Sequence, residues 1–501
     1  MKTLIKNGTV LVGKELDLVQ ADILIDNNTI AQMGPNISCE GAQEIDAAEK
    51  LIIPGLCNAH LHSDENIFKG KFDNLPLELW MLYTYPTLKY GPFSERFIYL
   101  RTMLGAMEMV KAGVTLAQDD ASEYPCSTLP GIDAIMNAYR DIGMRASVTT
   151  NLADKMWKDK IPYIPQIVPE EMLDQYSAAP SCEELYELAE EMIHRWHTPG
   201  GMTNVVLAPV APQRITDEFF LGMHRLSEKY NIPMHTHILE TKLQSMTGPL
   251  YYDGQSIIEH IHRLGVMSEK LTVIHSVWMS ERDIQLMGDS KVSVAHNPVS
   301  NLKLGSGIMP FRKLSDAGVN IALGTDGMSS IETQGIFEVM RMAALLHKVT
   351  HPDYNKWPSA KEIFTCATQG GARSTLRHGH VGHLDVGMRA DLSILSTKTL
   401  AFTPMGDPLN HLVYAENGSS IEKVMIDGKV VVDNGKILTV DENALIEELE
   451  SYLPEFWERY EHAKVWADKL FPYVDKIYQK SVVADIGLSR WSGDPKEWVE
   501  K

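Results

Sequence analysis

The chain has 501 residues, of which 44% are apolar and 22% charged, as is typical of a soluble globular protein with a large core. Its 46 Lys and Arg against 66 Asp and Glu give a net charge of -20, so we expect no nucleic-acid partner and no membrane partner. The five cysteines form no C-x-x-C pair, and no apolar run reaches the roughly 18 residues that a membrane span needs. The composition therefore predicts a reduced, cytoplasmic protein.

Both ends of the chain have the pattern of antiparallel hairpins. Residues 2–50 contain short alternating strands with turn signals at Lys6-Asn7-Gly8 and Asp26-Asn27-Asn28, and residues 390–440 repeat this pattern. Each set is too short to form a good sandwich alone. We therefore predict one small β-sandwich domain built from residues 1–52 and 381–440.

Between these ends, short apolar strands that end in a polar residue alternate with helical stretches. The eight strands are residues 56–62, 113–119, 145–151, 204–210, 232–238, 271–277, 291–297 and 320–326. Near-continuous apolar runs are typical of parallel strands that are covered on both faces. The pattern predicts an α/β fold, a (β/α)8 TIM-type barrel over residues 53–380, with function at the carboxyl ends of the strands. A doubly wound sheet is the alternative, although no G-x-G-x-x-G follows the first strand.

The last part of the chain carries apolar and aromatic side chains at helical spacing, from Leu449 to Val474, after a possible N-cap at Asp441. We predict a C-terminal helical extension over residues 441–501. Such a segment acts more often as a packing clamp or a subunit contact than as a functional site. We also expect a homodimer or a higher homo-oligomer.

The first barrel strand ends in His60 and His62. Alternate residues of a strand point to the same side, so both imidazoles project into the barrel mouth, as two ligands of one cation must. An isolated H-x-H motif is more often a structural pair of histidines, and this motif alone is a weak signal.

Three later strands also end in residues that bind metals. The fifth ends in His235 and His237, the sixth in His275 and the eighth in Asp326. Because the carboxyl ends of barrel strands meet at one mouth, these side chains would share a small space with His60 and His62. Three histidines, one carboxylate and an open position suit zinc, iron or a similar divalent ion.

These segments resemble those of the amidohydrolase superfamily, and within it the ATZ/TRZ type of aminohydrolases and chlorohydrolases that act on N-heterocycles. Residues 53–62, 235–240, 296–307 and 323–327 carry the resemblance. Residues 371–373 and 386–392 look like the family's return from the barrel to the β-domain. The similarity covers about residues 1–440.

The resemblance implies one divalent metal ion per subunit, with zinc as the first choice and iron as the second. The implied ligands are His60, His62, His237 and Asp326. His235 is the alternative to His237, and the choice rests on the three-residue offset from His237 to Glu240.

The resemblance also implies catalytic roles for Glu240, His275 and Asp326. Glu240 looks like the general acid that gives a proton to a ring nitrogen. Asp326 would also act as general base toward water, and His275 would orient this water or complete the metal coordination. Residues 204–211, in the fourth strand, contain no Lys or acidic residue that could bridge two metals, which favours a mononuclear site.

The predicted function is a metal-dependent hydrolase, a deaminase that removes an amino or similar group from a planar N-heterocycle of the pyrimidine, purine, pterin or triazine type. Attack by metal-activated water supplies the chemistry. The alternatives are an amidase or cyclic amidohydrolase on the same scaffold, a hydrolytic dechlorinase of a triazine-like ring, and a barrel that only binds.

The substrate pocket is less well defined by the sequence. We predict four substrate-binding residues: Asn301, Met328, Trp80 and Tyr83. Asp64 or Glu65 could receive an amino-bearing substrate, although a solvated loop or a helix N-terminus is the more common role of such acids.

Family members that deaminate adenosine-type thioethers carry a Glu, a His and an Arg as nucleoside contacts. The corresponding segments here read Thr87-Leu88, Val210 and Thr149-Thr150-Asn151. These three differences argue against an S-adenosylhomocysteine or methylthioadenosine deaminase.

Overall fold

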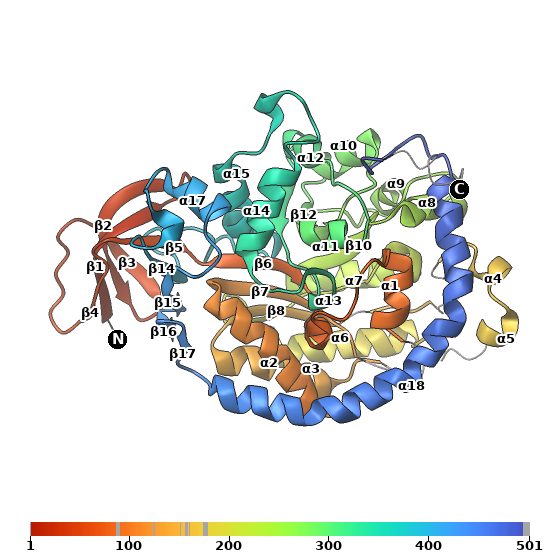
Figure 1. Cartoon of the computed structure of the whole chain (residues 1–501), viewed down its shortest axis with the longest axis horizontal. Helices are drawn as coiled ribbons and strands as arrows, with labels where there is room; N and C mark the ends of the chain where they lie inside the picture. Colours follow the sequence, from red (N-terminus) through yellow and green to blue (C-terminus); the bar gives the residue numbers. More distant parts are fainter. Residues whose placement is uncertain are drawn as a thin grey trace.

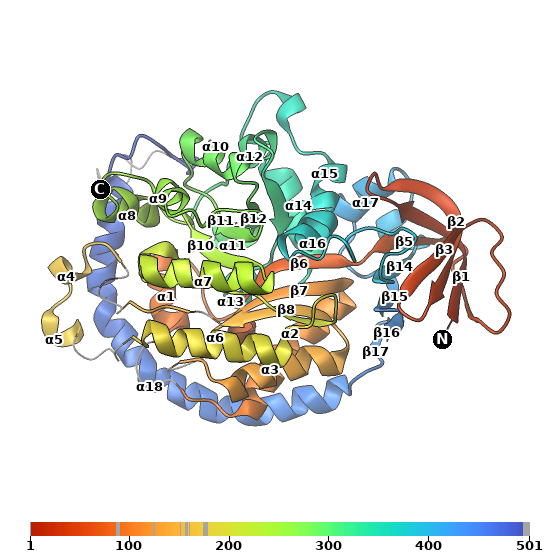
Figure 2. The ribbon, with the colours of Figure 1, turned by 180° about the vertical axis from the view of Figure 1, so that it is seen from behind.

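The computed structural model describes residues 2–86, 91–123, 126–150, 152–155, 159, 161–173 and 179–493 (Figure 1). Its described strands form one nine-stranded sheet and two four-stranded parallel sheets. The nine-stranded sheet lies at one end of the molecule, and the parallel sheets lie inside a layer of helices (Figures 1 and 2).

The nine-stranded sheet combines strands from both ends of the chain, in the order β17-β16-β15-β14-β5-β1-β2-β3 with β4 beside β1. Its strands are β1 Lys2–Val12, β2 Asp17–Asp26, β3 Thr29–Gly34, β4 Gln43–Asp46, β5 Lys50–Pro54, β14 Leu392–Ser396, β15 Ile421–Ile426, β16 Lys429–Asp433 and β17 Lys436–Ile437. β14 pairs antiparallel with β5, and Ile394 lies opposite Ile52. Both side chains belong to one buried apolar cluster, and the two regions share one sheet.

The eight strands predicted in the middle of the chain are all present, in the predicted order. They are β6 Leu56–Leu61, β7 Val114–Ala121, β8 Arg145–Thr150, β9 Thr203–Val205, β10 Met234–Ile238, β11 Leu271–His275, β12 Ser293–His296 and β13 Asn320–Leu323. β6 to β9 form one sheet and β10 to β13 the other. A parallel bridge joins Leu207 to Met234. On the opposite edge, the Asp326 N–H donates to the His60 carbonyl oxygen over 2.9 Å.

Helices cover the outer faces of the parallel sheets, as α3, α6 and α7 do in Figure 2. They are α1 Leu77–Thr84, α2 Glu95–Lys111, α3 Leu129–Ile142, α4 Ile164–Ile167, α5 Glu170–Leu173, α6 Cys182–Trp196, α7 Asp217–Tyr230, α8 Lys242–Tyr251, α9 Ile257–Arg263, α10 Glu281–Asp289, α11 Pro298–Lys303, α12 Phe311–Asp316, α13 Met328–Ile331, α14 Ile336–Leu346, α15 Ala360–Thr365, α16 Gly371–Ser374, α17 Pro408–Tyr414 and α18 Glu442–Val483. Short helical turns are η1 Ser63–Phe68, η3 Pro212–Arg214, η4 Tyr354–Lys356, η5 Cys366–Gly370 and η6 Leu400–Phe402. α6 shows why they form where they do: a capping box at Ser181 starts it, and Leu185 and Ala189 lie on its buried face.

The C-terminal helix α18 is 42 residues long and runs along the outside of the helical layer (Figure 1, blue). The Asp441 side chain caps its first turn by accepting the Ala444 N–H. Leu470 and Val474 pack in one apolar cluster with Leu79 of α1, so the helix holds α1 against the rest of the molecule. Within the described ranges, no helix has both the length and the apolar character that crossing a membrane requires.

Candidate metal centre

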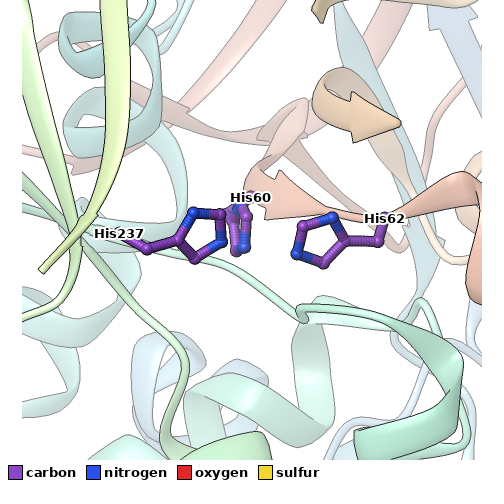
Figure 3. Close-up of side chains that lie close together, drawn as sticks. All are labelled: His60, His62 and His237. Carbon is purple, nitrogen blue, oxygen red and sulfur yellow. The ribbon is translucent and has the colours of Figure 1, made fainter. Parts of the chain in front are cut away.

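Three histidines, two buried (His60 and His62) and one partly exposed (His237), meet at the carboxyl ends of β6 and β10. His60 is in β6, His62 is the first residue after this strand, and His237 is in β10. Ligand atoms of the three lie within 4.8 Å of one another. The rings of His62 and His237 are nearly parallel, with centroids 5.4 Å apart. Figure 3 shows the ring of His60 between these two rings, so the three imidazoles surround one small space.

A carboxylate and a fourth histidine complete this group. Asp326 Oδ1 lies 3.4 Å from His62 Nε2 and 3.5 Å from His60 Nε2, and Asp326 Oδ2 lies 3.9 Å from His275 Nε2. Oxygen and nitrogen atoms that share one zinc ion at about 2.1 Å are separated by distances of this order. His275 and Asp326 each have φ of 69°, in the left-handed region, which is uncommon for these residues and more frequent at functional sites.

Hydrogen bonds orient the imidazoles toward the shared space. His62 Nδ1 donates to the Asp120 carbonyl oxygen over 2.6 Å, and His237 Nδ1 donates to the Val210 carbonyl oxygen over 2.9 Å. His275 Nδ1 donates to Asn301 Oδ1 over 2.9 Å. A ring that donates from Nδ1 keeps the lone pair of Nε2 free, which is the state that a metal ligand needs.

The electrostatics of this group favour a cation. Burial lowers the pKa of His60 to about 4, so its ring is neutral and can offer a lone pair. Burial also acts to lower the pKa of His62, but the surrounding carboxyl groups outweigh it and raise this pKa to about 10. Neither ring nitrogen of His60 has a hydrogen-bond partner within the part of the chain that the structure describes. Buried nitrogens of this kind next to carboxylates are a suitable donor set for a divalent metal.

Glu240 lies on the open side of the group. Its Oε2 is 3.4 Å from His275 Nε2, and its Oε1 accepts the Ser306 hydroxyl over 3.3 Å. Burial, followed by the nearby Asp326 carboxylate, raises the pKa of Glu240 well above its usual value. These surroundings favour the protonated form of Glu240, which can act as a proton donor.

A cavity opens onto this group. Its walls combine the polar residues of the centre (His62, His237, Glu240, His275 and Asp326) with a largely apolar side made of Leu77, Trp80, Met81, Tyr85, Val210, Ala211 and Leu304, and with Gln213, Arg214 and Gln244. An apolar cavity with a few convergent polar groups is the common form of a small-molecule site.

The four predicted substrate-binding residues lie in different places. Trp80 is in the cavity wall, whereas Asn301, Met328 and Tyr83 are not among the described residues that line it. Asn301 is buried and accepts the hydrogen bond from His275 Nδ1. Met328 is fully buried, and the Tyr83 hydroxyl donates to Asp468 over 3.1 Å.

Sequence reasoning did not single out several residues of the site. Gln213 and Arg214 line the cavity from η3, a turn that has no pattern to mark it as functional. Asp120 follows Asp119 at the end of the second barrel strand, and adjacent acids at a strand end were the available signal. Asp64 and Glu65, by contrast, were named from the sequence as possible substrate contacts. They are buried in the first turn of η1 rather than in a solvated loop, and burial raises the pKa of Glu65 to about 8.

His235 belongs to a second group that shares His60. Ligand atoms of His60, Asp120 and His235 also lie within 4.8 Å of one another, and all three residues are buried. Only His237 of the two candidate histidines lines the cavity among the described residues, together with Glu240 and Asp326. The geometry therefore favours His237 over His235 as the residue next to substrate.

Comparison with known proteins agrees with this picture. The model of the Amidohydrolase family matches residues 51–431. A 5-methylthioadenosine/S-adenosylhomocysteine deaminase from Pyrococcus furiosus is 30% identical over 448 residues, which cover 89% of this chain and 98% of the relative. A 5'-deoxyadenosine deaminase from Methanosarcina acetivorans is 29% identical over 460 residues, covering 91% of this chain and 98% of the relative.

Solved structures resemble the chain over a similar extent. An adenosine deaminase from Xanthomonas campestris with bound zinc has a TM-score of 0.80 at 26% identity and covers 91% of this chain and 98% of its own. An atrazine chlorohydrolase from Arthrobacter aurescens TC1 complexed with zinc has a TM-score of 0.82 at 24% identity and covers 90% and 99%. The second likeness concerns the fold alone.

Proposed function

The chain belongs to the amidohydrolase family and is a hydrolase of carbon–nitrogen bonds of the heterocycle-deaminase type, and from this premise we propose how its residues carry out the reaction. We propose that His60, His62, His237 and Asp326 hold one divalent metal ion, with zinc as the first choice. The fit rests on the buried, unpartnered ring nitrogens of His60 and on the free Nε2 atoms that the Nδ1 hydrogen bonds leave. Such an ion, when bound, lowers the pKa of a water molecule toward about 7.

The proton transfers belong to Asp326 and Glu240. The Asp326 carboxylate takes a proton from water, and the oxygen attacks the ring carbon that carries the amino group. Protonated Glu240 gives its proton to the adjacent ring nitrogen, which becomes basic as the carbon turns tetrahedral. The proton on Asp326 then passes to the departing amine, and the ionised Glu240 takes the proton of the new hydroxyl group. Amine and water thus become ammonia and a ring carbonyl, and both carboxyl groups return to their starting states. His275, 3.4 Å from Glu240 and held by Asn301, keeps the water oriented.

The apolar wall accommodates the ring of the substrate. Trp80 provides an aromatic face for a planar heterocycle, while Leu77, Met81 and Leu304 exclude water from the reacting carbon. Exclusion of water also keeps Glu240 protonated, because a desolvated carboxyl resists ionisation. Asn301 acts in this scheme through His275, and Met328 and Tyr83 remain predicted contacts.

Two findings bear on whether the substrate is a nucleoside. The relatives named above are deaminases of adenosine derivatives, whereas Val210 presents an aliphatic wall where the sequence predicts the loss of a nucleoside contact. Thr87, Leu88 and Asn151 lie outside the described residues. We keep the prediction of an aminated heterocycle as the substrate class, and the assay must include 5'-modified adenosines.

The observation that carries this proposal is the convergence of Glu240 and Asp326, with opposite pKa shifts, on one cavity that contains the histidine group. Its test is a panel of aminated and chlorinated purines, pyrimidines, pterins and triazines, and 5'-modified adenosines, assayed with metal analysis. We expect ammonia release with a shift in the ultraviolet absorbance of the ring. Chloride release would favour the dechlorinase, ring opening the cyclic amidohydrolase, and a metal-free chain without turnover a binding protein.

We also propose that the eight parallel strands close into a barrel over residues 53–380, and that residues 1–52 and 381–440 form a β-sandwich domain. We also propose that the helical extension over residues 441–501 completes the subunit, and that the subunits form a homo-oligomer. Light scattering of the purified protein tests the last of these.

A further inference from the structure

We propose that Asp120 is a positioning residue of the metal centre: it is not a ligand, but its charge and its carbonyl oxygen hold the three histidine ligands for a divalent cation. This inference rests on the proposed function, because it assumes that His60, His62 and His237 bind the ion. It adds a residue of β7, a strand that contributes no ligand to the proposed set.

The position of Asp120 is central to the three rings. Its carbonyl oxygen accepts the Nδ1–H of His62 over 2.6 Å, and its Oδ2 lies 3.8 Å from Nδ1 of His237. A carboxylate oxygen of Asp120 also lies within 4.8 Å of a ring nitrogen of His60. One residue therefore approaches every proposed nitrogen ligand from the side of β7.

The Asp120 carboxylate has no other evident function in the fold. It is fully buried, and neither of its oxygens has a hydrogen-bond partner among the residues that the structure describes. An ionised carboxylate in such a place is costly unless a positive charge lies close by. A divalent cation held by three histidines and Asp326 carries one uncompensated positive charge, and the Asp120 carboxylate is one of the buried acidic groups beside these rings that can balance it.

His235 lies close to the Asp120 carboxylate. It is two residues before His237 on β10, so its side chain lies on the same side of the strand. Ligand atoms of His235, Asp120 and His60 lie within 4.8 Å of one another, and both ring nitrogens of His235 lack a partner in the described ranges. His235 therefore lies close to both Asp120 and His60, although no hydrogen bond joins it to the carboxylate among the described residues.

The neighbouring residue Asp119 provides a matched control. It is also a fully buried carboxylate on β7, but it faces the opposite side of the strand, where it accepts the Ser63 N–H over 3.0 Å and the Tyr139 hydroxyl over 2.9 Å. Asp119→Asn and Asp120→Asn therefore remove the same charge from adjacent buried positions, and only the second faces the histidines.

The experiment measures zinc affinity of the full-length apo-protein by competition with a chromophoric chelator. We expect Asp120→Asn to bind zinc about 10- to 100-fold more weakly than wild type with one ion per chain retained, because loss of a partner of ligating histidines has effects of this size. Asp119→Asn should stay within about two-fold of wild type. The visible spectrum of the cobalt-substituted protein should change in Asp120→Asn and not in Asp119→Asn, since only the first alters the ligand field.

Three results would overturn the inference. Zinc affinity of Asp120→Asn equal to that of Asp119→Asn would remove Asp120 from the centre while leaving the proposed function intact. Complete loss of zinc in Asp120→Asn and His235→Ala, with retention in His237→Ala, would make Asp120 a ligand of a deeper ion. A wild-type chain that binds no divalent ion would overturn the proposed function as well. If Asp120→Asn does not fold, Asp120→Ser tests the same loss of charge.

Discussion

Both ends of the parallel sheets contain buried ionisable side chains, but these side chains differ in whether they have hydrogen-bond partners. At the amino end, Arg145 donates to both oxygens of Asp391 over 2.8 and 3.0 Å, to Asp427 over 3.0 Å and to the Gly201 carbonyl oxygen over 3.0 Å. At the carboxyl end, His60 and Asp120 are equally buried but have no such partners among the described residues. Buried charges that the chain neutralises itself stabilise the fold, whereas those left open are available to a ligand.

The largest expected effect is a loss of catalytic activity on substitution at the carboxyl end. Asp326→Asn and Glu240→Gln should each lower kcat by about 10³- to 10⁴-fold, since each removes a proton transfer while keeping the shape of the side chain. The melting temperature should change by only a few degrees, because Asn and Gln keep the size and much of the hydrogen-bonding capacity of the side chains that they replace. Steady-state kinetics and thermal unfolding check this, with the exposed Glu228→Gln as control. Wild-type kcat in either variant would contradict the assigned role.

At the amino end, the effect should fall on stability. Arg145→Met leaves the Asp391 and Asp427 carboxylates without their partner, and loss of one member of a buried ion pair costs about 3–5 kcal/mol of unfolding free energy. Denaturant unfolding measures this loss, and the folded fraction should bind as much metal as wild type. Arg96→Met is the matched control, since it breaks an exposed pair with Glu448 and should cost about 1 kcal/mol or less. Equal losses in both variants would contradict the comparison.

A smaller effect should come from a pair of buried histidines, His296 and His347, at the carboxyl end. His296 Nε2 and His347 Nε2 are 2.9 Å apart, and burial lowers the pKa of His347 to about 3. The unfolded chain takes up this proton near pH 6.5, so the stability that neutral His347 contributes is present above pH 6.5 and is lost as the pH falls.

His347→Gln keeps a hydrogen-bonding side chain but cannot titrate. Between pH 6.5 and pH 5, wild type should lose about 2 kcal/mol more unfolding free energy than this variant, at 1.36 kcal/mol per pH unit. Urea unfolding at a series of pH values gives the difference, in which the other histidines cancel. Parallel pH profiles for the two proteins would show that His347 is not held neutral by the fold.

Much of the fold was predictable because strong local patterns coincide with it. The eight apolar runs in the middle of the chain became the eight parallel strands in order, with helical stretches between them. The ligand candidates followed from the same pattern, since each is at a strand end. Family membership and hydrolase activity agree with the comparisons, whereas the individual site roles stay predictions.

The rest of the site depends on facts that no local pattern contains. Which of Asp119 and Asp120 faces the histidines is set by the register of β7 against β6, which shifts between Asn58 and Leu61. Two aromatic residues of α1 also have different surroundings that the sequence does not distinguish. Trp80 lines the cavity, whereas Tyr83 is hydrogen-bonded to Asp468 of α18. Arg214 reaches the cavity from a turn whose place is fixed only by the folded chain.

The long helix α18 has a consequence for how the enzyme matures. Leu470 and Val474 of this helix pack with Leu79 and Leu82 of α1, the helix that contributes Trp80 and Met81 to the cavity wall. During synthesis, every proposed metal ligand leaves the ribosome before α18 does. All the proposed ligands are therefore outside the ribosome before the cavity wall gains its outer support, which requires residues 442–483.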